Sequence, residues 1–324
     1  MKKLIAVILI IATVFTVVTA ADRTTLDGKM DDFATKLADF IPRSISNMNL
    51  WADAHIGNII PLKGLPHLGA GATAGGVLIP TDLITTFKDA FPKGTKEWEL
   101  FPLPALSFDA RVGGFILPFD VGIHLMALEN YEKEFWDVKA EMTNLLTYGG
   151  DVRFAILQEG VIAPALSIGV GYTKAKGEFI ITTTDTLPDS ALSAATAILG
   201  TGDDEDAYTE LSVAYDTSIY TASVQLSKKI LLLTPFIGAR AFVQNGVYDY
   251  SYSYDQIDGV TNNGSTTKTI EKSFSFNNLA NSDFKYSVFA GLGVDFLIIQ
   301  TTVGANYDFT DKSWAGSISI HVKI

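Results

Sequence analysis

The last forty residues of the chain alternate between apolar and polar side chains with a period of two. Over residues 284–296 the apolar positions share one side of an extended chain, and only Phe289 is out of step. The alternation returns over 299–309 and, after a polar turn, over 314–324. Because successive side chains of a β-strand point to opposite faces, this stretch predicts three strands, each with one apolar and one polar face.

The length of these strands favours a membrane. Runs of ten to thirteen residues suit a tilted bilayer crossing, which takes about 9–11 residues, whereas globular strands usually have about 5–6. The apolar faces end in aromatic residues, which suit the headgroup level of a bilayer: Phe284, Phe296, Tyr307, Phe309 and Trp314. A secreted soluble β-sandwich, which hides one face of each strand and wets the other, is the competing interpretation.

On these residues the chain resembles the bacterial outer-membrane β-barrel proteins, whose last strand carries alternating apolar residues and ends at the C-terminus. The resemblance covers residues 49–324 and concerns architecture alone; the fatty-acid-transporter type, which pairs an amino-terminal plug with a barrel, is only an analogy. It implies the lipid bilayer and the barrel-assembly machinery as partners. Ile324 departs from the pattern, because that family usually ends in an aromatic residue.

The first twenty residues have the pattern of a cleaved signal peptide. Lys2 and Lys3 precede an apolar run over 4–18, and small residues allow cleavage after Ala20. An uncleaved anchor is the alternative, although the run is short for a spanning helix of about 20 residues. We therefore expect secretion into the cell outer membrane. The predicted parts are a signal peptide, an amino-terminal helical segment and a β-barrel domain: 1–20, 21–48 and 49–324.

Composition narrows the classes further. No later segment is apolar for long enough to be a spanning helix. A membrane location therefore requires a closed barrel, since only helices and closed sheets satisfy every backbone group in lipid. The chain has no cysteine, which excludes disulfides and thiol chemistry. Its net charge is −12, so we expect no nucleic-acid partner.

Between the signal and the final strands, the pattern predicts one short amphipathic helix. Four apolar residues recur at helical spacing: Met30, Phe33, Leu37 and Phe40. With Asp27 as a cap, they predict a helix that ends before Pro42. This helix either plugs the barrel, packs against its periplasmic rim or lies on the membrane surface.

Counting alternating segments back from the C-terminus gives about twelve strands, within a range of ten to fourteen. The predicted fold is all-β, an antiparallel up-and-down transmembrane β-barrel. We expect its first strand at 50–58 and turns at 174–177 and 216–218. Long loops are expected at 80–103, 129–144 and 245–283, all on the side outside the cell.

If the apolar faces point to lipid, the charged residues and histidines of the polar faces point into the lumen. These candidates are Asp53, His55, Asp109, Arg111, Asp120, His124, Asp151, Arg153, Arg240, Lys285, Asp295, His321 and Lys323. In a narrow lumen such groups either pair and close it or line a wet path that selects solutes. Arg111 lies two residues from Asp109, and Arg153 two residues from Asp151, so we expect each pair to help neutralise its own charge.

Catalytic and cofactor chemistry find little support in the sequence. There is no GxSxG on a strand–turn–helix and no HExxH, and the four histidines are scattered. We therefore expect no enzyme, no metal site and no cofactor. The acidic run at 203–206 lacks EF-hand spacing, so we interpret it as a solvated loop.

Three functions stay open at this point. The first is a passive channel or selective importer, porin-like, for small or hydrophobic solutes. The second is a structural or adhesive surface barrel with projecting loops and no transport. The third is the soluble sandwich. A barrel exposes Ile318, Ile320 and Val322 and encloses Ser317 and Ser319, whereas a sandwich does the reverse.

Overall fold

The computed structural model describes residues 34–56, 67–78, 102–114, 118–135, 138–185, 207–256, 266–277 and 284–324. Within these residues it has one helix, at 34–46, and eleven strands. The strands are β1 (His67–Leu78), β2 (Pro102–Gly113), β3 (Phe119–Phe135), β4 (Val138–Leu157), β5 (Ala165–Asp185), β6 (Ala207–Ser227), β7 (Leu233–Gln256), β8 (Thr266–Asn277), β9 (Lys285–Phe296), β10 (Ile299–Asp308) and β11 (Ser313–Lys323).

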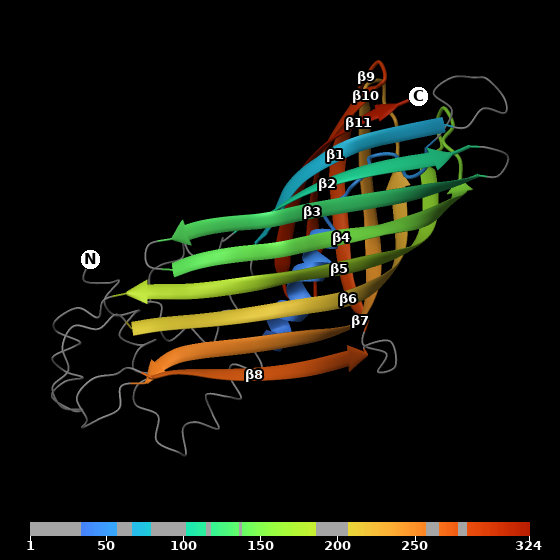
Figure 1. The fold of residues 1–324 in the computed structure, drawn as a ribbon. Coiled ribbons are helices and arrows are strands. Elements are labelled where there is room, and N and C mark those ends of the chain that lie inside the picture. The colour runs from blue at the N-terminus through green and yellow to red at the C-terminus, as the bar shows by residue number, and fades with distance from the viewer. Residues whose placement is uncertain are drawn as a thin grey trace.

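Ten of the eleven described strands close into a ring (Figure 1). Neighbours pair antiparallel in chain order, except that β7 passes directly to β9. The ring closes through a ladder between β1 and β11 that runs from Gly69↔Lys323 to Val77↔Ala315. β8 lies outside the ring and, among the described strands, pairs with the far half of β7 alone. The fold is therefore an all-β antiparallel barrel of ten strands, not the expected twelve.

Ten lies within the expected range of ten to fourteen, but the central count of twelve is too high because long strands resemble hairpins in the sequence. β5 and β6 run unbroken through the turns expected at 174–177 and 216–218. The loop expected at 129–144 consists largely of β3 and β4, which pair as far as Phe135↔Val138. Polar residues interrupt the apolar pattern where a strand leaves the bilayer, and in the sequence such interruptions resemble turns.

The faces of the wall are those of a membrane barrel and not those of a sandwich. Ile318, Ile320 and Val322 of β11 are 50%, 55% and 41% exposed. Ser317 and Ser319, between them, are 8% and 1% exposed. On this strand, apolar side chains therefore cover the outside of the ring and small polar side chains face its inside, which excludes the soluble sandwich.

The two faces exchange character partway along the long strands. On β5 the outward positions are apolar from Leu166 to Tyr172 and charged at 174, 176 and 178, whereas the inward positions are small or polar up to Thr173 and turn apolar at Ala175. The ring of Tyr172 lies 5.4 Å from that of Tyr220 on β6, centroid to centroid. Because tyrosine suits the boundary between hydrocarbon and water, this level marks one edge of the membrane-embedded band.

Beyond that edge the strands continue into water. β3 to β7 have 17, 20, 21, 21 and 24 residues, about twice what a crossing of about 9–11 residues needs. Figure 1 shows them extending together with β8 toward one side. We call β8 and the parts of β3 to β7 beyond Tyr172 and Tyr220 the projecting sheet.

The chain ahead of β1 lies inside the ring. The helix at 34–46 is followed by an irregular segment as far as Ile56, and we call residues 34–56 the plug. Leu37, Phe40 and Ile41 are buried in one apolar cluster with inward side chains of the wall, such as Tyr250. Figure 1 shows the helix, in blue, within the curve of the sheet.

Two expectations about this segment are wrong. The helix continues through Pro42 to residue 46, although an interior proline costs about 3 kcal/mol. Burial of nearly the whole helix offsets that cost, and Ser46 Oγ donates to the Pro42 carbonyl at 2.6 Å. Residues 50–56 form no strand, because they pair with side chains of the wall and not with a neighbouring backbone. The expected start of the helix, at Asp27, lies outside the described residues.

On the side away from the projecting sheet, the short connections expose large apolar side chains. Val161 and Ile162, between β4 and β5, are 99% and 91% exposed. Leu231 and Leu297 have φ of 56° and 54°, a left-handed conformation that costs a residue with a side chain about 1–2 kcal/mol and favours Gly or Asn. A leucine at such a position is understandable if the turn touches lipid.

The apolar band on the outside of β5 also indicates that the short connections contact lipid. Its outward apolar positions run only from 166 to 172, fewer than the about 9–11 residues of a crossing. The turns at the end of the strand would complete the band. We therefore expect these short connections to dip into the hydrocarbon.

Single-cysteine labelling tests the depth of these turns, because the chain has no cysteine of its own. Ile162→Cys and Leu231→Cys, each carrying an environment-sensitive fluorophore, should emit as in an apolar medium and be quenched by brominated lipid in vesicles. Lys176→Cys, on the outward face of the projecting sheet, is the matched control and should emit as in water. Water-like emission from all three positions would contradict the expectation.

Candidate functional site

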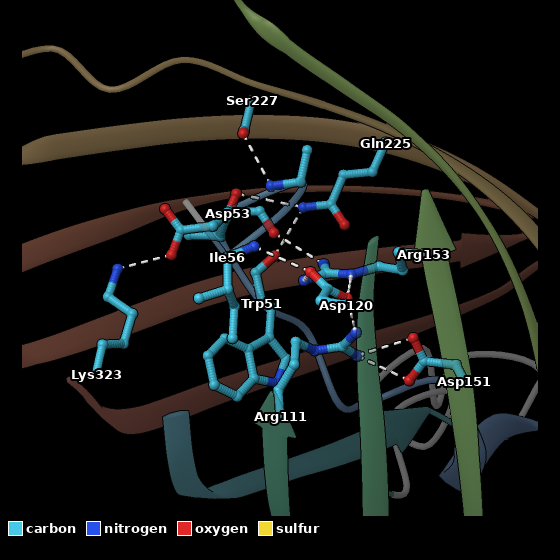
Figure 2. Close-up of polar contacts among 12 residues, drawn as sticks. Trp51, Asp53, Ile56, Arg111, Asp120, Asp151, Arg153, Gln225, Ser227 and Lys323 are labelled. Atoms are coloured by element: carbon cyan, nitrogen blue, oxygen red, sulfur yellow. Dashed lines mark hydrogen bonds and ion pairs between the residues drawn. The ribbon is translucent and has the colours of Figure 1, made fainter. Parts of the chain in front are cut away.

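Residues 51–56 of the plug donate hydrogen bonds to inward carboxylates of the wall (Figure 2). Trp51 Nε1 donates to Asp109 Oδ2 at 2.7 Å, and the Ile56 N–H donates to Asp120 Oδ2 at 2.9 Å. The Trp51 ring also stacks on His321, with 3.9 Å between centroids. These contacts hold the plug to β2, β3 and β11 without any backbone ladder.

The wall donates in return to backbone carbonyls of the plug. Gln225 Nε2 donates to the Trp51 carbonyl at 2.7 Å and to the Ala52 carbonyl at 3.2 Å. Arg153 Nη1 donates to the Asp53 carbonyl at 2.8 Å. An irregular backbone segment inside a barrel needs such partners, because its N–H and C=O groups have no strand neighbour.

Four side chains of β2, β3 and β4 form a neutral network that we call the charge cluster: Arg111, Asp120, Asp151 and Arg153 (Figure 2). Asp120, fully buried, accepts from Arg153 Nε at 2.9 Å and Nη2 at 2.8 Å and also from Arg111. Arg111 Nη2 reaches both Asp151 oxygens, at 2.7 and 2.9 Å. Since Asp120 also accepts the Ile56 N–H, the cluster and the plug stabilise one another.

A second ionic contact holds the plug near the end of β11. Lys323 Nζ lies 2.6 Å from Asp53 Oδ2 on the plug and 2.8 Å from Asp295 Oδ1 on β9. Lys229 Nζ, in the turn before β7, lies 3.2 Å from the other Asp295 oxygen. Through Lys323, the plug is thus held to β11 and linked to β9.

At the other end of the plug, a single buried guanidinium gathers three carboxylates. Arg43 Nε donates to Asp308 at 3.1 Å, Nη1 donates to Asp39 at 2.9 Å, and Nη2 pairs with Asp311. Lys285 joins through Asp39. Burial raises the pKa of Asp311, in the turn after β10; Arg43 opposes that rise, and the neighbouring Asp308 and Asp39 carboxylates add to it. This end of the helix is therefore anchored to β9, to β10 and to the turn after β10.

Glycines of the wall make room for the plug. A Cβ at Gly69 of β1 would lie 2.6 Å from Trp51 Cη2, and one at Gly304 of β10 would lie 2.5 Å from Leu50 Cδ1. A side chain at either position would force Trp51 or Leu50 to move. β1 is rich in glycine and shows almost no alternation of apolar and polar residues. Its glycines form part of the surface on which the plug packs.

Eleven of the expected lumen residues are wall residues whose side chains lie inside the ring. Seven of them are buried: Asp109, Arg111, Asp120, Arg153, Asp295, His321 and Lys323. Four are partly exposed to the interior space: His124, Asp151, Arg240 and Lys285. Asp53 and His55 were expected on a wall strand and instead lie on the plug.

The expected pairing along single strands is wrong. Arg111 pairs with Asp120 and Asp151, not with Asp109, and Arg153 pairs with Asp120. Residues two apart on a strand are about 6.6 Å from each other, whereas directly opposed residues on neighbouring strands have Cβ atoms about 4.5–5.5 Å apart. The register, which sets Asp120 opposite Arg153, therefore decides the partners.

The sequence patterns did not identify several residues that hold the plug in place, on the plug itself and on the wall. Asp39 and Arg43 were not singled out, although an acid and a base four residues apart in an otherwise apolar helix were a usable signal. Gln225 and Ser227 were missed because neutral polar residues on a strand carry no distinguishing mark. Ser227 Oγ accepts the Ala54 N–H at 2.9 Å.

A polar cavity of about 90 Å³ remains between the plug and the wall. Its lining includes Asn49 and Trp51 of the plug and Arg111, Arg153 and Arg240 of the wall. Elsewhere on the inner wall, buried polar atoms lack a protein partner among the described residues, including both Gln244 amide atoms and Thr302 Oγ1. Buried polar groups of this kind are usually satisfied by water.

Nothing in the described part of the chain forms a metal centre. Within those ranges, no group of three or more His, Asp or Glu side chains could hold a metal ion. The acidic run at 203–206 lies outside them. His124 Nε2 lies 3.1 Å from Thr173 Oγ1, an ordinary contact of the inner wall.

The closed ring, its apolar outside and its polar, plugged inside define a transmembrane β-barrel, the architecture of bacterial outer-membrane proteins. Among the described residues, no helix is both long and apolar enough to cross a membrane. The protein is thus an outer-membrane-type barrel in its architecture, as the resemblance stated from the sequence implies.

Solved structures similar to this chain are outer-membrane barrels. The outer membrane protease OmpT from Escherichia coli is 8% identical, with 80% of this chain and 93% of that chain covered and a TM-score of 0.37. The translocator domain of the autotransporter NalP from Neisseria meningitidis is 11% identical, with 90% and 98% covered and a TM-score of 0.38. A Pseudomonas aeruginosa FadL homologue is 10% identical, with 80% and 89% covered and a TM-score of 0.30. TM-scores this low say nothing about a shared activity.

No family model and no curated protein sequence matches the chain.

Replacing the central carboxylate of the charge cluster should destabilise the barrel. Asp120→Asn leaves Arg111 and Arg153 short of negative charge in a buried site, which typically costs about 3–5 kcal/mol. The midpoint of the heat-induced electrophoretic shift of the detergent-folded protein should fall. Lys139→Gln, which removes an exposed pair with Glu132, is the control and should leave the midpoint unchanged. Equal midpoints for the two variants would show that the cluster contributes nothing.

Proposed function

We propose that the protein is an outer-membrane channel, a selective importer of small solutes, whose lumen the plug closes in the conformation described. The observation that carries the proposal is that the wall is complete without the plug. The ladder between β1 and β11 closes the ring backbone to backbone, and residues 34–56 take no part in it. A segment that fills a lumen without building its wall can leave that lumen without breaking the barrel.

The contacts of the plug suit a movable part. Residues 51–56 are held by separate hydrogen bonds and ion pairs, several of them to charged groups, and a hydrogen bond of that kind contributes about 1.5–3 kcal/mol. Water can replace such contacts one by one. The wall, in contrast, is held by long cooperative backbone ladders. Displacement of the plug is therefore far less costly than opening of the ring.

The two ends of the lumen suit different parts of a solute. The helix lies in an apolar cluster that includes Met142, Tyr215 and Tyr250 on the side of the projecting sheet. Residues 51–56 lie among charged and polar groups toward the short turns. Such a path fits small solutes with some apolar character. The orientation that goes with import puts the short turns in the periplasm and the projecting sheet outside the cell.

Other expectations stay predictions alongside this one. Cleavage after Ala20 and the signal peptide concern residues outside the described ranges. The bilayer, the barrel-assembly machinery and the absence of enzymatic activity are expected on the grounds given for the sequence.

Conductance across planar bilayers tests the channel. The intact protein should show small or intermittent currents, and a variant lacking residues 34–56 should show a large, steady conductance because its lumen is empty. Liposome swelling with neutral sugars of increasing size should follow the same order. A plug-deleted barrel that shifts normally on heating, and so is folded, yet passes neither ions nor sugars would remove the proposal.

A second function, an adhesive or structural surface barrel, is favoured by the projecting sheet. β7 has 24 residues, and its far half pairs with β8, which takes no part in the ring. The projecting sheet lies beyond the bilayer and is not needed to close the barrel. It therefore offers a surface to the exterior.

Removal of β8 separates the two functions. Because β8 lies outside the ring, deletion of residues 266–277 should leave the barrel folded and its conductance unchanged. If the projecting sheet is an adhesive surface, binding of the expressing cells to host-cell or matrix-coated plates should fall. Lost conductance with retained adhesion would instead tie β8 to transport and count against the surface role.

A further inference from the structure

Among the residues that the structure describes, the inward cation Arg240 has no carboxylate partner. Arg240 of β7 donates to the Asn47 carbonyl at 3.0 Å and to the Asn49 carbonyl at 3.3 Å, and its guanidinium lies 4.5 Å from the centroid of the Phe289 ring. No carboxylate oxygen of the described residues lies within salt-bridge distance of it. Two of its five N–H groups are used, which leaves three to face other partners.

The neighbours of Arg240 differ from those of the other inward arginines. Arg153 stands directly opposite Asp120. Arg240 instead stands opposite Ser223 on β6 and Ser287 on β9. The Ser287 hydroxyl is buried and has no partner among the described residues. The barrel thus sets the Arg240 guanidinium between two hydroxyl groups, whereas Arg111 and Arg153 both reach carboxylates on neighbouring strands.

The wall is shaped to hold Arg240 in this place. Phe289, the residue out of step in the alternation of β9, points inward and is 2% exposed. Gly238 leaves the room that the Phe289 ring needs, because a Cβ there would collide with it. The ring supports the guanidinium from one side by a cation–π contact.

The cavity of about 90 Å³ lies beside this guanidinium. Its lining holds three guanidinium groups and only one carboxylate, that of Asp151, together with the hydroxyls of Thr173, Thr221 and Ser223. One water needs about 10–15 Å³ by this measure, so the space accepts several waters or a small molecule. Hydroxyl and guanidinium donors around a hydrated space suit an anion with several oxygen acceptors.

We propose that the cavity beside Arg240 binds a small oxyanion, a carboxylate or a phosphate, through the guanidinium and the neighbouring hydroxyls. A planar guanidinium offers two parallel N–H groups to such an anion. The bound anion would neutralise Arg240, which pairs with no carboxylate of the described residues. This binding site stands apart from the channel function, because it requires no movement of the plug and no passage of solute.

Calorimetric titration of the detergent-folded protein tests the site, with sodium phosphate and sodium acetate as separate probes in a buffer without competing oxyanions. The wild type should bind at least one probe saturably, and the tighter of the two identifies the class. Arg240→Gln should weaken that binding about tenfold or more, since a hydrogen bond to a charged group contributes about 1.5–3 kcal/mol.

Ser223→Asp provides a second variant that keeps Arg240. It sets a carboxylate directly opposite the guanidinium, which should occupy the site from within and abolish binding of both probes. Lys139→Gln is the control, because it removes a cation that lies outside the cavity and is paired with Glu132, and its affinity should equal that of the wild type. Each variant is first checked for the heat-induced electrophoretic shift. Absence of saturable binding by the folded wild type, or equal affinity in the wild type and Ser223→Asp, overturns the proposal.

Discussion

Closure of the backbone ladder between β1 and β11 is the constraint on which the rest of the structure depends. In hydrocarbon an unpaired N–H or C=O costs several kcal/mol, so a sheet in a membrane has no permissible edge. Once the ring is closed, successive side chains of a membrane-embedded strand alternate between the enclosed interior and the lipid. The apolar outside, the polar inside and the place for a plug all follow from that one condition.

An enclosed polar interior creates a problem of its own, because charges there are partly removed from water. The barrel resolves it mainly by pairing: two arginines with two aspartates in the charge cluster, and Arg43 with three carboxylates at the other end of the plug. The plug takes part in both networks. The polar part of the interior is therefore held together by ion pairs and hydrogen bonds, beside the apolar cluster that buries the helix.

The long strands show that one strand can serve two environments. On β5 the change from Tyr172 to Lys174 outside, and from Thr173 to Ala175 inside, reverses the pattern within four residues. The same backbone ladder continues across the change. Lipid thus sets the side-chain pattern on one stretch and water on the next, while hydrogen bonding between strands stays the same.

The sequence by itself determined the strands, their faces and the membrane-spanning architecture, because period-two alternation is local and strand length is read directly. It also placed eleven candidate residues on inward faces. The strand count, the pairing of Arg111 and Arg153, and the location of Asp53 and His55 on the plug were decided only by tertiary structure. Register between strands and the course of residues 50–56 depend on contacts between distant parts of the chain. Phe289 is an example: in the sequence it only interrupts the alternation, and its contact with Arg240 exists because β7 and β9 pair.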